Sequence, residues 1–272
     1  MWGIIPAAGV GSRIQPLAFS KELLPVGSRL DAGAERPCAV SEYLVERMLR
    51  GGADKICFVI ASGKSDILEY YGGAYGGAAI AYVVQQQPRG LCDAIFCASP
   101  LVGSDEPVVV GLPDTVWFPE DGLAALPDDR LSFLLFPVDH PEYFDAVELD
   151  EDDNVREIQV KRADATSRWI WGAFKMPGRV LRELQDLWIA RERQDEFIGT
   201  LVNAYLANGG EAVGVKAGSA YVDVGTLHGY REAIALLAEA AKREGSGAAG
   251  ARVALAWPAG RPIESVHDLN RQ

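Results

Sequence analysis

Apolar and polar positions follow a regular order through the first 112 residues. Four apolar runs are short and continuous enough to form buried strands, at 2–8, 55–61, 80–85 and 107–112. Three segments between them carry apolar residues at helical spacing, at 41–50, 65–71 and 91–98. We expect Ser41 to cap the first helix and Gly51-Gly52 to end it. This alternation predicts an α/β fold with a parallel sheet covered on both faces.

The pattern changes after about residue 131. Four strand-like segments then follow one another with short turns, at 131–138, 145–150, 155–160 and 169–176. Helical spacing returns near 178–192, 196–208 and 231–243. We therefore expect a mixed sheet with helices, continuous with the sheet of the first half. Residues 245–251 have the composition of a flexible linker, and the last twenty residues are expected to form a small appendage.

The composition limits which classes of molecule the protein is expected to bind. The chain has 272 residues, of which 49% are apolar and 24% charged, as in an ordinary soluble globular protein. A net charge of -12 disfavours nonspecific binding to nucleic acid or to an anionic membrane. An anionic ligand would therefore need local cations or a metal ion. No apolar run approaches the ~20 residues of a membrane span.

The spacing and surroundings of the cysteines indicate the cellular compartment. Cys38, Cys57, Cys92 and Cys97 include no CxxC pair, and we expect buried, reduced thiols in a cytoplasmic protein. The first residues, Met-Trp-Gly, have neither a basic region nor a long apolar stretch, so no signal peptide is predicted.

A glycine-rich loop follows the first predicted strand, in IIPAAGVGSRIQPLAFSKELLPV at residues 4–26. Gly9 and Gly11 would let backbone N–H groups reach oxygen atoms. Arg13 can hold two oxygens with its planar guanidinium, and Lys21 adds a compact positive charge. The loop therefore predicts a phosphate chain as its ligand. The alternative is that Arg13 and Lys21 are ordinary surface cations.

Two better-known phosphate loops do not fit. The dinucleotide fingerprint GxGxxG fails because Ile14 occupies the third glycine position, and Pro16 argues against a long helix after the loop. A Walker A loop ending at Gly63-Lys64-Ser65 fails because Phe58 stands where its first glycine belongs. We interpret that segment as a strand-to-helix turn with a solvent-facing Lys64.

The loop resembles the signature of the sugar-1-phosphate nucleotidylyltransferases. The matching residues are Ala8-Gly9-Val10-Gly11-Ser12-Arg13, then Pro16, then Lys21-Glu22-Leu23-Leu24-Pro25-Val26. Three more of the family's elements follow in its order, as VVQQQPRGLCDA, GLPDTVW and YVDVGT. The resemblance covers residues 4 to about 240. In pattern the chain is most similar to glucose-1-phosphate thymidylyltransferases and UTP–glucose-1-phosphate uridylyltransferases.

The resemblance implies a fold and a division of the chain. The family fold is a Rossmann-like, mostly parallel mixed sheet with helices on both faces, which agrees with the strand and helix pattern. The nucleotidyltransferase domain would span 1–240, with a nucleotide-binding half at 1–130 and a sugar-binding half at 131–240. Residues 241–272 would form the linker and the C-terminal appendage.

The implied reaction is nucleotidyl transfer. An oxygen of a sugar 1-phosphate attacks the α-phosphorus of a nucleoside triphosphate in line, and pyrophosphate leaves. The attacking phosphate is already anionic, so the protein needs no nucleophile or strong base; it must position two anions and neutralise their charge. The three histidines, His140, His228 and His267, are then structural or surface residues.

The resemblance also implies roles for particular residues. Arg13 would act at the β- and γ-phosphates, and Lys21 would neutralise the α-phosphate and bridge the attacking phosphate. Asp114 and Asp223 would hold Mg2+ with phosphate oxygens. The nucleotide would contact Ala8, Gly9, Gly11, Ser12, Gln85 and Gly90. The sugar phosphate would contact Lys161, Gly172 and Arg193.

Several positions depart from the family pattern or have another interpretation. Val160 and Arg162 flank Lys161 where relatives carry glutamate and proline, and Asp145 fills the place of a glycine. Gln86 or Gln87 could replace Gln85 at the base, although the spacing to Gly90 favours Gln85. The acidic segment LDEDDN at 149–154 lacks the glycine of a calcium-binding EF-hand and is expected to be a solvated turn.

The leading hypothesis is a Mg2+-dependent transferase that joins a pyrimidine nucleotide from dTTP or UTP to glucose 1-phosphate. Its partners would be the two substrates and possible further copies of the chain, without nucleic acid or membrane. One alternative is a non-catalytic nucleotide-sugar-binding regulator on the same fold. Another is a transferase for a different phosphorylated acceptor, such as an amino-sugar or polyol phosphate.

Overall fold

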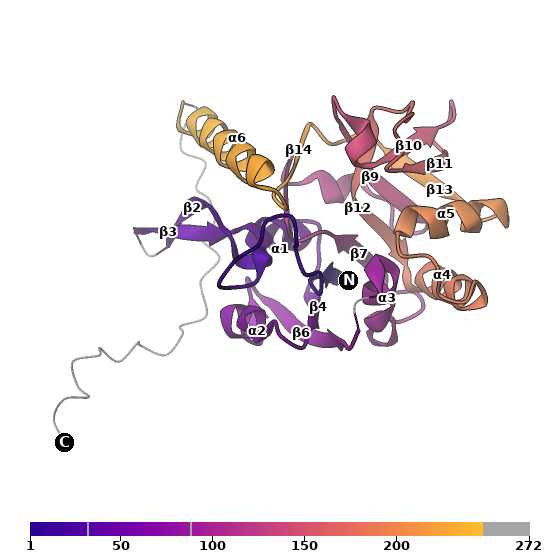
Figure 1. Cartoon of the computed structure of the whole chain (residues 1–272), viewed down its shortest axis with the longest axis horizontal. Coiled ribbons are helices and arrows are strands. Elements are labelled where there is room, and N and C mark those ends of the chain that lie inside the picture. Colours follow the sequence, from indigo (N-terminus) through magenta and orange to yellow (C-terminus); the bar gives the residue numbers. More distant parts are fainter. Residues whose placement is uncertain (32, 88, 247–272) are drawn as a thin grey trace, which may run out of the picture.

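A ten-stranded sheet forms the centre of the protein (Figure 1). The computed structural model describes residues 1–31, 33–87 and 89–246. Four parallel strands, in the order β7-β1-β4-β6, make the middle of the sheet: β1 (Trp2–Pro6), β4 (Lys55–Ala61), β6 (Ala78–Gln85) and β7 (Pro107–Gly111). Short β5 (Ala74–Tyr75) pairs antiparallel with β6 at one edge.

The second half of the chain extends this sheet from β7. Antiparallel β12 (Trp169–Pro177) lies beside β7 and carries the strands β9 (Leu131–Pro137), β10 (Asp145–Leu149) and β11 (Val155–Val160). β13 (Ala212–Val215) runs parallel to β9. The expected continuity between the halves is therefore confirmed. The proposed domain boundaries remain a prediction, because both halves contribute strands to one sheet.

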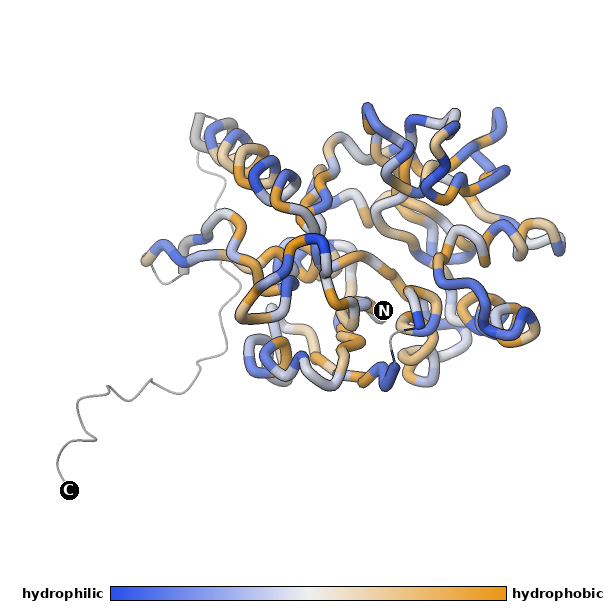
Figure 2. The backbone as a smooth tube through the Cα atoms, in the orientation of Figure 1, coloured by the Kyte–Doolittle hydropathy of each residue, from blue (hydrophilic) through white to orange (hydrophobic). Residues whose placement is uncertain are grey.

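Helices cover both faces of the sheet because successive strand residues point to opposite sides. On one face, Ile4 and Cys57 pack under α3 (Gly90–Cys97), α4 (Gly178–Ala190) and α5 (Ile198–Ala207). On the other face, Ile5 and Phe58 pack under α1 (Val40–Arg50) and α2 (Ser65–Tyr71). Figure 2 shows hydrophilic turns at the end of the molecule that carries β10 and β11.

A third apolar cluster lies beside the main sheet. It joins the hairpin β2 (Pro25–Asp31) and β3 (Ala34–Ala39), the strand pair β8 (Thr115–Phe118) and β14 (Ala220–Asp223), and the helix α6 (Leu227–Ser246). In Figure 1 the hairpin and α6 project together from the sheet. This cluster fixes the position of β14, which ends at a predicted metal ligand.

Some local predictions are wrong. Ser41 does not cap α1, because the helix starts at Val40; Ser41 is buried, and its Oγ lies 2.6 Å from the hydroxyl of Tyr71. The carboxylate of Glu42 instead accepts the backbone N–H of Ala39 at 3.0 Å.

The boundaries of the last helix also differ from the prediction. α6 begins at Leu227 and continues to Ser246, so it includes the first two residues of the expected linker. The rest of the linker and the appendage lie outside the described residues. The strands β2, β3, β5, β8, β13 and β14 were not predicted, since they are short or polar.

Two other expectations, for unpaired cysteines and for a turn at the acidic segment 149–154, are confirmed. The four cysteines are free; Cys38, Cys57 and Cys92 are buried, and burial raises the pKa of Cys57 to about 12. The acidic segment at 149–154 forms a turn in which the Asp150 carboxylate accepts backbone N–H groups. Within the described part of the chain, no helix is long and apolar enough to cross a membrane.

The start of α2 anchors both ends of the glycine-rich loop. The Lys64 ammonium, predicted to face solvent, instead lies 2.8 Å from both carboxylate oxygens of Glu22 and 2.7 Å from the carbonyl oxygen of Ala7. Glu22 is fully buried, and burial raises its pKa while Lys64 opposes the shift. The prediction for Lys64 failed because Glu22, distant in sequence, supplies a buried partner.

A second contact strengthens the same anchor. The backbone N–H and the hydroxyl of Ser20 both donate to the Asp66 carboxylate, at 2.6 and 2.7 Å. Ser20 and Glu22 flank Lys21 in the chain. The backbone that carries Lys21 is therefore tied to α2 from both sides.

Replacing Lys64 by methionine should lower the free energy of unfolding by about 3–5 kcal/mol, because it leaves the buried Glu22 carboxylate without its cation. Urea unfolding followed by circular dichroism would measure the change. The matched control is Lys55→Met, which removes a partly exposed pair with Glu106 and should change the free energy by about 1 kcal/mol or less. Equal losses in the two variants would contradict the anchoring role.

Candidate functional site

Four charged side chains from distant parts of the sequence meet beside the glycine-rich loop. The ammonium of Lys21 lies 2.5 Å from Oδ2 of Asp114, and Nη2 of Arg13 lies 3.1 Å from Oδ2 of Asp223. Lys21 and Asp114 are mostly buried, whereas the Arg13 side chain is 61% exposed. These are the predicted catalytic cations and metal ligands, and the structure places them together.

The strand pair β8 and β14 explains why the two aspartates are neighbours. Asp114 directly precedes β8, and Asp223 ends β14, where it pairs in register with Thr115. The backbone N–H of Val224 donates to the carbonyl oxygen of Asp114 at 2.8 Å. Two carboxylates more than a hundred positions apart are thus held at one end of a short antiparallel ladder.

Gly225 leaves room for this cluster to converge. A Cβ atom at this position would lie 2.8 Å from Oδ1 of Asp223, 2.9 Å from Nη2 of Arg13 and 3.3 Å from Oδ2 of Asp114. The backbone N–H of Gly225 also donates to Oδ1 of Asp223 at 2.7 Å and orients that carboxylate. A side chain here would fill the space in which both carboxylates and the guanidinium face one another.

The donor set suits a hard divalent cation. Two carboxylates converge on one space, and carboxylate oxygens are the ligands that Mg2+ prefers, usually with substrate phosphates completing its shell. No group of three or more His, Cys, Asp or Glu side chains forms a metal cluster in the part of the chain that the structure describes. The residues therefore fit an ion that is shared with a phosphate ligand.

The glycine-rich loop has an open outer face and a crowded inner one. Gly9 is exposed, and a Cβ atom there would meet nothing within 4 Å. Gly11 adopts a φ of 68°, and a Cβ atom there would lie 2.6 Å from Cδ of Lys21. Of the other two predicted contacts, Ala8 is buried and Ser12 exposed. Gly11 therefore gives the Lys21 side chain its path to Asp114.

The charge on Lys21 is stable in this setting. Burial alone would lower the pKa of Lys21, but the charge and the hydrogen bond of Asp114 raise it above its ordinary value. Lys21 therefore remains an ammonium at neutral pH. A ligand phosphate that displaces Asp114 would meet a full positive charge.

The predicted base-binding residues lie at the end of β6 and the start of α3. Gln85 ends β6, and its amide nitrogen donates to the Asp93 carboxylate at 2.6 Å. Gly90 opens α3 with a φ of 88°, and a Cβ atom there would lie 2.8 Å from Cα of Glu196. Asp93 thus fixes the orientation of the Gln85 amide, and Gly90 permits a close contact with the second half of the chain.

The predicted sugar-phosphate residues are less closely grouped. The ammonium of Lys161 lies 4.6 Å from the ring centroid of Phe197, the residue after the Glu196 that contacts Gly90. Gly172 packs where a Cβ atom would lie 2.5 Å from Phe136 and 2.8 Å from Tyr221. Lys161 and Gly172 are therefore connected to the site through neighbouring residues.

Arg193 has a different setting. Its guanidinium carbon lies 5.5 Å from the ring centroid of Trp188 on α4, and its φ is 59°. The backbone N–H of Arg193 also donates to the carbonyl oxygen of Trp188 at 2.8 Å. Both contacts of Arg193 are with Trp188 of α4, and its assignment to the sugar phosphate stays a prediction.

Sequence reasoning missed several residues that support the site. Glu22, Lys64 and Asp66 anchor the loop, and Asp93 orients Gln85. Of these, Asp93 had a visible signal, since it lies in the same sequence element, VVQQQPRGLCDA, as Gln85. The three anchor residues had none, since their partners are distant in sequence.

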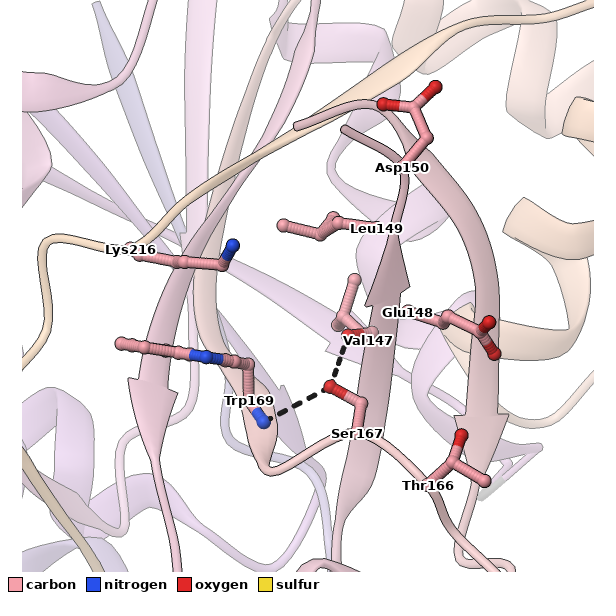
Figure 3. A pocket seen from close by; sticks show the side chains of 8 residues that line it. All are labelled: Val147, Glu148, Leu149, Asp150, Thr166, Ser167, Trp169 and Lys216. Atoms are coloured by element: carbon pink, nitrogen blue, oxygen red, sulfur yellow. Dashed lines mark hydrogen bonds between the residues drawn. The ribbon is translucent and has the colours of Figure 1, made fainter. Parts of the chain in front are cut away.

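A hollow lies away from this site. Its volume is about 310 Å³, and it is lined by Val147, Glu148, Leu149, Asp150, Thr166, Ser167, Trp169 and Lys216 (Figure 3). The Ser167 hydroxyl donates to Val147 and accepts the N–H of Trp169, and Lys216 pairs with Asp153. Its polar groups serve internal contacts, so the charged cluster is the better candidate.

Known proteins with similar sequences include two nucleotidyltransferases. A low-salt glycan biosynthesis nucleotidyltransferase of Haloferax volcanii is 31% identical over 170 residues, which cover 58% of this chain and less than half (44%) of that protein. A glucose-1-phosphate thymidylyltransferase of Neisseria meningitidis is 28% identical over 243 residues, covering 86% of this chain and 81% of the relative.

A solved structure and a family model extend the likeness. The UTP-bound UGPase of Acinetobacter baumannii superposes with a TM-score of 0.69 at 21% identity, over 87% of this chain and 92% of that one, which shows the shared fold. The family model for nucleotidyl transferases matches residues 2–240. The chain therefore belongs to the nucleotidyl transferase family, which confirms the resemblance to sugar-1-phosphate nucleotidylyltransferases predicted from its motifs.

Proposed function

We propose that this protein transfers a nucleoside monophosphate from dTTP or UTP to a sugar 1-phosphate, with Mg2+, and releases pyrophosphate. The observation that carries this proposal is the convergence of Lys21, Asp114, Arg13 and Asp223 beside a glycine-rich loop in a chain of this family. Relatives named glucose-1-phosphate thymidylyltransferase and UTP–glucose-1-phosphate uridylyltransferase support the choice of substrates.

The chemistry requires positioning more than proton transfer. A phosphate oxygen of the acceptor forms a bond to the α-phosphorus while the bond from that phosphorus to the bridging oxygen of the β-phosphate breaks. Lys21 neutralises the α-phosphate and the incoming phosphate, and Arg13 neutralises the leaving pyrophosphate. Preorganised cations of this kind stabilise a developing negative charge without a protein nucleophile.

Asp114 and Asp223 would hold Mg2+, which when bound supplies positive charge to the phosphate oxygens. Both carboxylates already pair with a cation in the structure, so neither is an isolated negative charge. If each carboxylate exchanged its side-chain cation for a metal ion shared with phosphate, Lys21 and Arg13 would be free to contact the substrates.

The nucleobase would lie against Gln85 and Gly90. The Gln85 amide nitrogen is held by Asp93, so the carbonyl end of the side chain has a defined direction. An amide with one fixed orientation can distinguish donor from acceptor positions on a pyrimidine edge. It does not separate dTTP from UTP, whose bases differ by one methyl group worth about 1–3 kcal/mol in a fitted pocket.

The alternative from a different functional class is a non-catalytic regulatory protein. Such a protein could keep the loop glycines and Gln85 and lose a cation or a carboxylate. Here both cations and both carboxylates are present and paired, which favours an enzyme.

Pyrophosphate release should require three components together: Mg2+, glucose 1-phosphate and either dTTP or UTP. A coupled phosphate assay across dTTP, UTP, CTP, ATP and GTP, with and without the acceptor, would measure it. Because the reaction needs both substrates in one site, omission of either should abolish release. Tight binding of UTP or dTTP without turnover for any phosphorylated acceptor would favour the regulator instead.

Substituting a metal ligand should remove activity more than nucleotide binding. We expect Asp114→Asn and Asp223→Asn each to lower kcat by about 100-fold or more, since charge stabilisation at the transferring phosphate is lost. The exposed Asp121→Asn, seven positions from Asp114, is the matched control and should behave as wild type. Raising the Mg2+ concentration should partly restore the variants; unchanged kcat in both would refute the metal role.

A further inference from the structure

The small sheet that carries the two predicted metal ligands is separate from the main sheet. In the described part of the chain, β8 and β14 pair only with each other. Asp114 directly precedes β8, and Asp223 ends β14. The place of both carboxylates relative to the cations of the loop therefore depends on what holds this two-stranded sheet to the rest of the protein.

Arg47 of α1 attaches β8 to that helix. Its Nε and Nη2 atoms both donate to the carbonyl oxygen of Trp117, at 2.8 and 2.5 Å, and its Nη1 atom donates to the carbonyl oxygen of Tyr43 at 2.8 Å. Hydrogen bonds alternate along an antiparallel strand, and the bond from Val224 to Asp114 sets this alternation so that Trp117 faces away from β14. The guanidinium thus occupies the edge of β8 that has no strand beside it.

Arg47 is buried, and its polar contacts are with backbone oxygen atoms. Its side chain is 2% exposed, and its guanidinium carbon lies 4.9 Å from the ring centroid of Trp117. In the part of the chain that the structure describes, its hydrogen bonds all go to carbonyl oxygens and none to a carboxylate. Burial of a charge without an opposite charge is costly, and an apolar side chain would fill this place at lower cost. Packing alone therefore does not require an arginine here.

The cations and the carboxylates of the site are anchored to different helices. Lys64 at the start of α2 holds Glu22, the neighbour of Lys21, whereas Arg47 of α1 holds β8. The 2.5 Å contact between Lys21 and Asp114 joins these two units. A change in the Arg47 contact would therefore move the carboxylates relative to Lys21 and to a phosphate bound beside it.

We propose that Arg47 is a positioning residue for the two predicted metal ligands. By holding the carbonyl of Trp117, it fixes Asp114 and Asp223 at the place that an ion shared with phosphate requires. This proposal rests on the proposed function, because it concerns the ion of the same site. Arg47 acts through these ligands and does not itself contact the ion, so its loss should weaken the binding that depends on the metal and leave the binding of the nucleotide alone.

The test compares Arg47→Met with wild type on the full chain near neutral pH. Calorimetry would give the dissociation constant of a UTP analogue, with a methylene group between its α- and β-phosphorus atoms, in the absence and presence of Mg2+. The ratio of the two constants measures how many times the ion tightens binding. Arg47→Met should lower this ratio by about tenfold, as is usual when a group that orients metal ligands is lost, and should leave the constant without Mg2+ unchanged.

Two further variants separate positioning from general stability. Arg50→Met removes a partly exposed pair with Glu120 from the same helix, three positions from Arg47, and should keep the wild-type ratio. Arg47→Lys keeps the charge but loses the planar group that reaches two carbonyl oxygens, and should lower the ratio by about threefold. If circular dichroism shows that Arg47→Met does not fold, Arg47→Lys carries the test.

The outcomes separate this proposal from the proposed function. An unchanged ratio in the folded Arg47 variants, an equal loss in Arg50→Met, or a wild type whose affinity does not depend on Mg2+ overturns the role of Arg47. A lowered ratio, together with a wild type that releases no pyrophosphate with any phosphorylated acceptor, overturns the proposed function and leaves the role of Arg47 supported.

Discussion

The pairing of Lys21 with Asp114 and of Arg13 with Asp223 is the interaction on which the site depends. In a chain with a net charge of -12, the general field repels an anionic ligand, so attraction must come from cations fixed at short range. Each cation is held by a carboxylate that is itself a suitable ligand for a metal ion. Without a ligand, the charges of the two cations and the two carboxylates therefore cancel. With a phosphate ligand and a metal ion, the same four groups become complementary to phosphate.

The arrangement of the sheet places this set between two regions with different tasks. The loop after β1, the end of β6 and the start of α3 carry the groups assigned to the nucleotide. Lys161, directly after β11, and Gly172, within β12, are two of the groups assigned to the acceptor. β12 lies beside β7, so both regions belong to one hydrogen-bonded sheet. The short ladder of β8 and β14 then brings Asp114 and Asp223 to the boundary between them.

Much of this could be predicted from the sequence, because the pattern within each element is local. Continuous apolar runs predicted β1, β4, β6 and β7. The resemblance of four motifs to those of a known family pointed to Arg13, Lys21, Asp114 and Asp223. What failed depended on distant partners. Lys64 was predicted to be exposed because its buried partner, Glu22, is 42 positions away. Ser41 was predicted to cap α1, but the carboxylate of Glu42 accepts the N–H of Ala39 instead. The short strands β8 and β14 form only because each supplies the other's hydrogen bonds.

The anchors at Ala7, Ser20 and Glu22 have a consequence for binding entropy. A glycine-rich loop loses more conformational freedom than other segments when a ligand orders it, and that loss opposes binding. Here Lys64 holds the carbonyl of Ala7 at one end of the loop, and Asp66 and Lys64 hold Ser20 and Glu22 at the other. Lys21 is therefore restricted before any phosphate arrives, and only the exposed middle of the loop remains to be ordered by the ligand.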